Sequence, residues 1–104
     1  MKIPKVGQPV RGSTTGRPIM VALDLLGRRA ALRILWELRG EPLTFRALLE
    51  AADTNPSLLN TRLKEMREAG LIDHEGQGYC LTEAGLALLK ALRPLQDWAE
   101  KWCK

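Results

Sequence analysis

The fold is decided by residues 44–85, TFRALLEAADTNPSLLNTRLKEMREAGLIDHEGQGYCLTEAG. Thr44 and Asn55 each precede a segment with helical apolar spacing, and both are side chains that cap helix N-termini. Pro56 follows Asn55 at the first helical position, where its missing N–H is not needed. The stretch therefore predicts a helix capped by Thr44, the turn 52–54, and a second helix over residues 56–69.

A short hairpin is expected after the second helix. Gly70 lies where helices commonly end on a left-handed residue. Residues 71–75 and 79–81 have strand character and flank a glycine-bracketed turn at residues 76–78. Thr82 then caps a last helix that runs to about Trp102. This order predicts a mainly α fold with a small β-hairpin wing, the winged helix-turn-helix, which places its second helix in the DNA major groove.

Two further helices, over residues 18–26 and 28–39, are expected before this unit, with Gly27 and Gly40 ending them. Residues 18–104 then form one domain, since 104 residues are too few for two. Residues 1–17 carry four basic side chains and no acid among Gly, Pro, Ser and Thr, which predicts a flexible basic arm. Such an arm can follow a phosphate backbone or enter a minor groove, and the alternative is a solvated tail without a binding role.

The composition excludes several classes. No apolar stretch has the length of a membrane span, and the basic N-terminus has no apolar segment behind it, so we do not expect it to be a signal peptide. Two cysteines are too few for a disulfide framework, so a reducing cytoplasm is the expected setting. His74, Cys80 and Cys103 are the only soft metal ligands, too few for a structural zinc site, although His74 and Cys80 could approach each other on the hairpin. No nucleophile with its base, phosphate loop or carboxylate pair is present, so we expect no enzyme and no cofactor.

The helix over residues 56–69 carries the candidate reading face. Leu59, Leu63 and Met66 define its buried side, and short polar groups occupy the other side. Asn can pair with adenine, Ser and Thr with several bases, and Leu with a thymine methyl. We therefore expect base contacts from Ser57, Leu58, Asn60 and Thr61. Phosphate contacts are expected from Arg46, Arg62 and Lys64, with Arg28 and Arg29 adding affinity. Arg62 lies at the edge of the buried side, so pairing with an acidic side chain is the alternative for it.

The charge count supports an alternative function. Residues 44–70 contain four basic and four acidic side chains, and the wing carries Asp73 and Glu75 without a cation. Because phosphate neutralisation supplies most non-specific DNA affinity, a neutral unit also suits a winged helix protein–protein interaction module. A continuous positive strip across a dimer would favour DNA.

The last helix predicts self-association. An apolar stripe recurs at steps of three and four, too broad for a monomer of this size to cover, whereas Leu86 and Leu89 can serve the monomer core. Together with the first helix, the predicted dimer interface comprises Ile19, Leu23, Leu88, Leu92, Leu95, Trp98 and Trp102. A homodimer would suit a pseudo-palindromic operator. An unidentified small-molecule effector could sit between the terminal helices and the first helix.

Residues 18–102 resemble the HxlR-type winged helix regulators. The resemblance is carried by Phe45-x-x-Leu48, Leu59-x-x-Arg62-Leu63, Gly70-Leu71-Ile72, Leu81-Thr82-Glu83-x-Gly85 and Trp98. It implies a dimeric prokaryotic transcription regulator whose terminal helices pair the subunits. The chain departs from the family in lacking its Gly-Gly-Lys-Trp segment and its early sensing cysteine, and in having a shorter, acidic wing.

Overall fold

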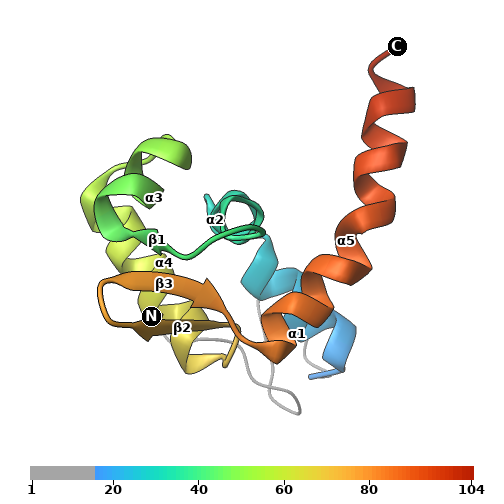
Figure 1. Cartoon of the computed structure of the whole chain (residues 1–104). Helices are drawn as coiled ribbons and strands as arrows, with labels where there is room; N and C mark the ends of the chain where they lie inside the picture. The colour runs from blue at the N-terminus through green and yellow to red at the C-terminus, as the bar shows by residue number, and fades with distance from the viewer. Residues whose placement is uncertain (1–15) are drawn as a thin grey trace.

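The computed structural model describes residues 16–104, and residues 1–15 of the expected basic arm lie outside the described residues. Figure 1 shows the elements in chain order. They are α1 (Pro18–Leu26), α2 (Ala31–Glu37), β1 (Leu43–Thr44), α3 (Phe45–Ala51), α4 (Pro56–Glu68), β2 (Ile72–Glu75), β3 (Gly78–Leu81) and α5 (Glu83–Trp102). The mainly α winged helix fold expected from the sequence is confirmed.

Three predicted N-caps are confirmed. The side chain of Thr44 accepts a hydrogen bond from the Ala47 amide at 3.1 Å. Asn55 does the same for the Leu58 amide at 2.8 Å, directly before Pro56. Thr82 accepts from the Gly85 amide at 3.1 Å. Each bond satisfies a backbone donor that has no partner within the helix, so the starts of α3, α4 and α5 are encoded locally.

The end of α4 also follows the sequence signal. Gly70 has a φ of +78°, the left-handed conformation that glycine adopts without strain. The Leu71 amide donates to the Met66 carbonyl at 2.9 Å, and the Gly70 amide donates to the Arg67 carbonyl at 3.0 Å. This pair of bonds is the Schellman motif, which turns the chain directly from α4 into β2 of the hairpin.

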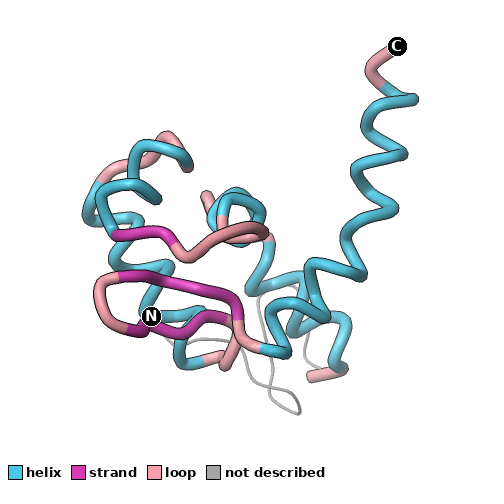
Figure 2. Tube along the Cα trace, viewed as in Figure 1, coloured by secondary structure: helices cyan, strands magenta, loops and turns pink. Residues whose placement is uncertain are grey.

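The sheet has three strands, whereas the sequence predicted two. Its order is β1-β3-β2, with both pairs antiparallel (Figure 2). The two-residue strand β1 pairs Leu43 with Tyr79, and a segment of that length has no periodicity to reveal it. Gly78 belongs to β3 rather than to the turn, because it pairs with Glu75.

The second helix is shorter than predicted. Residues 28–30 form a turn, and α2 starts only at Ala31. Ala30 has a φ of +70°, which is incompatible with continuing a right-handed helix. The predicted helix over residues 28–39 is therefore wrong at its N-terminal end, and the turn places Arg28 and Arg29 between α1 and α2.

The core joins α2 to the helix-turn-helix. Its fully buried side chains come from three helices and are Ile34, Leu35, Leu48, Leu59, Leu63 and Met66. Leu89 of α5 is buried, as expected. Leu86 was expected to serve the core as well, but its side chain is 53% exposed, so that expectation is wrong. The burial of Leu59, Leu63 and Met66 turns the opposite face of α4 outward.

Helix α5 begins against the sheet and then leaves the body of the domain. Figure 1 shows its C-terminal half standing apart from the other elements. Pro94 lies inside this helix, where its ring removes one backbone hydrogen bond. Within residues 16–104, no helix combines the length and the apolar character needed to cross a membrane.

Candidate nucleic-acid interface

A groove runs between α4 and the wing. Its volume is 430 Å³, and it is lined by Asn60, Thr61, Leu63, Lys64, Arg67 and Tyr79. The structure thus brings three of the predicted contact residues together on an exposed face. It adds Arg67 and Tyr79, which the sequence analysis did not select. Arg67 follows Lys64 by three residues on the same helix face, so helical spacing alone could have identified it.

The start of α4 presents small polar groups. Ser57 and Asn60 are exposed, and Leu58 is half-buried. The Thr61 hydroxyl donates to the Ser57 carbonyl at 3.1 Å, which leaves its oxygen as an acceptor. An acceptor at this position suits the amino groups of adenine or cytosine in the major groove. Asn60 can offer both a donor and an acceptor to adenine.

Two of the predicted phosphate contacts lie at the surface. Arg46 of α3 is 90% exposed and forms a loose ion pair with Glu50, with 3.9 Å between the charged atoms. An exposed pair of this kind contributes little stability, so the guanidinium can turn to a phosphate at small cost. Arg29 is exposed in the turn between α1 and α2. Both side chains therefore remain available for contacts outside the chain.

The predicted phosphate contacts of Arg28 and Arg62 are wrong. Their side chains are only 9% and 11% exposed. Arg28 donates to Glu65 and, at 3.2 Å, to Asp24. Arg62 donates to Glu65 at 2.8 Å and to the Arg29 carbonyl at 2.8 Å. Because both guanidinium groups are buried among these partners, they do not reach a surface phosphate.

The wing is acidic and carries an aromatic stack. The His74 ring lies on the Tyr79 ring, with centroids 4.1 Å apart, because these residues are cross-strand partners. Cys80 is paired with Asp73 and faces the other side of the hairpin, so the expected approach of His74 to Cys80 is wrong. Burial raises the pKa of the Cys80 thiol, and the carboxylates of Glu75 and Asp73 raise it further. The thiol is therefore protonated at neutral pH, which disfavours oxidation.

The predicted dimer residues are mostly uncovered in the single chain. Ile19, Leu23, Leu95, Trp98 and Trp102 are between 50% and 69% exposed. The two tryptophan rings stack with centroids 5.1 Å apart near the free end of α5. Leu92 is half-buried, and Leu88 packs against the core, so Leu88 is committed in part to the monomer.

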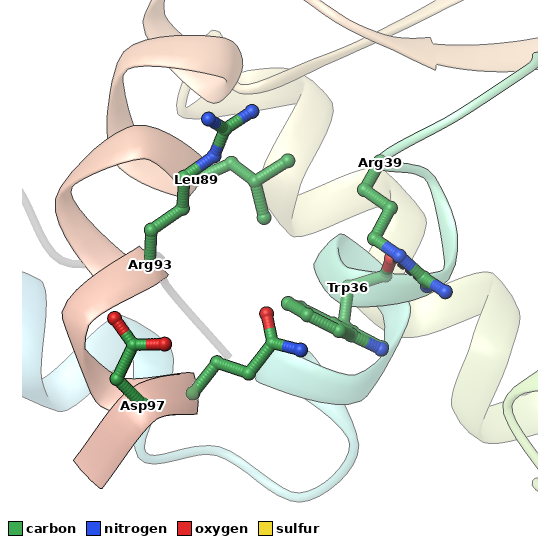
Figure 3. Close-up of a pocket in the computed structure, with 6 residues that line it drawn as sticks. Trp36, Arg39, Leu89, Arg93 and Asp97 are labelled. Atoms are coloured by element: carbon green, nitrogen blue, oxygen red, sulfur yellow. Dashed lines mark hydrogen bonds between the residues drawn. The ribbon is translucent and has the colours of Figure 1, made fainter.

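A second hollow lies between α2 and α5. Figure 3 shows Trp36 and Leu89 bordering it, with Arg93 and Asp97 on α5 and Arg39 beyond α2. Its volume is 490 Å³. The Arg39 guanidinium lies 4.4 Å from the centre of the Trp36 ring and donates to the Trp36 carbonyl. The hollow lies between the core and the projecting part of α5, and none of its lining residues comes from α1, beside which the sequence analysis placed an unidentified effector.

Comparisons with known proteins agree with this architecture. The family model described as winged helix-turn-helix matches residues 31–100. The uncharacterized HTH-type transcriptional regulator MJ0925 of Methanocaldococcus jannaschii is 26% identical over 83 residues, covering 75% of this chain and 78% of that protein.

Solved structures show the same likeness. The chain is similar to quinone-bound YodB from B. subtilis, with a TM-score of 0.73, 31% identity, and coverage of 81% of this chain and 97% of that chain. It is also similar to reduced HlyU from Vibrio cholerae, with a TM-score of 0.61, 26% identity, and coverage of 74% and 86%. Since the family model spans more than half of the sequence and the YodB structure covers most of it, the chain belongs to the winged helix-turn-helix family.

Proposed function

We propose that this protein is a transcription regulator of the HxlR type that binds a pseudo-palindromic operator as a homodimer in the cytoplasm. The observation that carries the proposal is the exposed groove along α4, where Asn60, Thr61 and Lys64 lie together. Each α4 would enter a major groove, where Ser57, Leu58, Asn60 and Thr61 read bases. Lys64, Arg46, Arg29 and the newly identified Arg67 would hold phosphates.

Exposed apolar side chains on two helices support dimerisation. Ile19 and Leu23 on α1 and Leu95, Trp98 and Trp102 on α5 expose large apolar side chains. A monomeric protein rarely leaves large apolar patches in water, and tryptophan is enriched in protein interfaces. The names of two similar proteins support the regulatory role rather than the dimer, since MJ0925 and YodB are themselves named transcriptional regulators. The effector expected from the sequence remains a prediction, for which the hollow between α2 and α5 offers room.

The alternative function is a winged helix module that binds another protein. The observation in its favour is charge: with Arg62 and Glu65 paired internally, the exposed cations Arg46, Lys64 and Arg67 are matched in number by exposed acids of the same unit. The affinity for DNA would then depend on the two copies of the domain in the proposed dimer, on Arg29, and on the basic arm.

Substitutions in α4 test the assignment of roles. Lys64→Ala is expected to weaken binding to all duplexes by a similar factor and to reduce the salt slope by about 1, because a phosphate contact carries no sequence information. Asn60→Ala is expected to weaken binding by about 5-fold to 100-fold only at one or two base pairs.

Fluorescence anisotropy over a salt series, with every single-base variant of the operator, measures both effects. Lys90→Ala is the matched control, since it removes an exposed lysine of α5 far along the chain from the reading face. The roles would be wrong if Asn60→Ala weakened all duplexes alike and left the base preference unchanged.

A further inference from the structure

Four charged side chains meet between α4 and the turn that joins α1 to α2. Each oxygen of the Glu65 carboxylate accepts from a different guanidinium, Oε2 from Arg28 and Oε1 from Arg62. Arg28 also donates to Asp24 of α1. The four side chains are 6% to 11% exposed. This ion cluster, comprising Asp24, Arg28, Arg62 and Glu65, has two positive and two negative charges and is therefore neutral.

Stability alone is a weak reason for such a cluster. Removing charges from water costs several kcal/mol per ion, and apolar side chains of similar volume often stabilise a fold as well or better. Charged hydrogen bonds differ from apolar contacts because they are directional. With one guanidinium on each Glu65 oxygen, the cluster restricts how α4 can rotate or slide against the turn.

The backbone of the turn supports this interpretation. Ala30 has a φ of +70°, a conformation that is unfavourable for a residue with a Cβ atom. The carbonyl of the preceding residue, Arg29, accepts from Arg62 of α4. Strained backbone persists where surrounding contacts determine it. The turn is thus held in one conformation by bonds that come from α4.

The other end of the cluster lies on α1. Asp24 directly follows Leu23, which is 57% exposed and belongs to the proposed dimer face. Only Val21 and Leu25 of α1 are buried in the chain's own core. The bond from Arg28 to Asp24 therefore links a lightly anchored helix of the dimer face to the middle of α4.

We propose that the ion cluster fixes the orientation of α4 relative to α1 and so sets the half-site spacing that the dimer accepts, with Arg28 as the positioning residue. The inference rests on the proposed function. Each added base pair separates half-sites by about 3.4 Å and rotates them by about 34°. A rigid connection from the dimer face to α4 makes the protein sensitive to that change, whereas a loose connection tolerates it.

The test compares duplexes in which two copies of the preferred half-site are separated by spacings that vary one base pair at a time. The wild-type protein is expected to bind about 10-fold or more weakly when the half-site spacing differs by one base pair from the preferred spacing. Arg28→Met, which keeps the apolar stem, is expected to lose less than about 3-fold at the same offset. Its affinity for a duplex with a single half-site should equal that of wild type.

Arg33→Met is the matched control. It breaks an ion pair with Glu37 and a bond to the Ala51 carbonyl, neither of which involves α1 or α4. Its spacing profile should match that of wild type. Should Arg28→Met fail to fold, Arg28→Lys keeps a charge but cannot hold both carboxylates in the same geometry, and its profile should also broaden.

The outcomes separate the two proposals. If wild type shows no preferred half-site, the proposed function fails. If wild type has a sharp optimum and the Arg28 variants share it, the positioning role is overturned. Equal losses at every spacing and at the single half-site would show that Arg28 serves only the local structure of α4, and would also overturn it.

Discussion

Gly85→Ala is expected to destabilise the domain by about 3 kcal/mol or more, and to lower its Tm by more than about 12 °C. A Cβ atom at this position would lie 2.2 Å from the Leu71 carbonyl oxygen, which is part of the backbone and has little freedom to move. Gly85 therefore allows the first turn of α5 to touch the junction of α4 and the wing.

The clash would break a specific set of bonds. The same Leu71 carbonyl accepts the Thr82 amide at 3.1 Å, and the Thr82 hydroxyl donates to the Gly70 carbonyl. Moving α5 away to accommodate a methyl group removes both hydrogen bonds, each worth about 1 kcal/mol, and disturbs the packing of Leu89. Since small domains are stable by only about 5–15 kcal/mol, the loss is a large fraction.

Thermal and urea unfolding, followed by circular dichroism at one fixed protein concentration, measure this effect. Gly40→Ala is the control, because a Cβ atom there meets no other heavy atom within 4 Å. It should change stability by less than about 1 kcal/mol. A Gly85→Ala protein as stable as wild type would contradict the described contact between α5 and Leu71.

If the proposed dimer forms through α5, Trp98→Glu is expected to raise its dissociation constant by about 100-fold or more. The ring of Trp98 is 55% exposed in the single chain and stacks on Trp102, so a charge at this position would be buried against the partner's apolar face. Affinity for a two-half-site duplex should fall by a comparable factor, because the second half-site contact is no longer within the same particle.

Sedimentation at several concentrations measures the first effect, and titration of single and double half-sites measures the second. Arg93→Glu places the same charge on the opposite side of α5 and should leave the dimer intact. Wild type that sediments only as an 11.6 kDa monomer at micromolar concentration would contradict the proposed assembly.

The parts of the fold that are set by residues close together in the sequence could be predicted. Thr44, Asn55 and Thr82 cap their helices, and Gly70 ends α4, because each signal acts within a few residues. Strand β1 could not be predicted, since two residues become a strand only through pairing with β3. The left-handed backbone conformation of Ala30 could not be predicted either, because alanine has no local preference for that conformation.

The same difference between local signals and tertiary contacts applies to the candidate site. Helical spacing predicted the outward face of α4 with Asn60, Thr61 and Lys64. It also placed Arg62 at the edge of the buried side, where the bond to Glu65 confirms the alternative of pairing with an acid. It could not show that Arg28 is buried, because Arg28 lies in a turn and is held by Glu65 of a different helix. Tyr79 reaches the groove through the register of β3, a tertiary feature that no helix pattern contains.

The most direct test of the account is the affinity for a site selected from genomic DNA, compared with a shuffled duplex of the same composition at the same salt concentration. We predict that the protein binds the selected site at least about 10³-fold more tightly, as specific regulators do. Equal affinity for the two duplexes would contradict sequence-specific DNA binding and would favour a protein partner for the exposed face of α4.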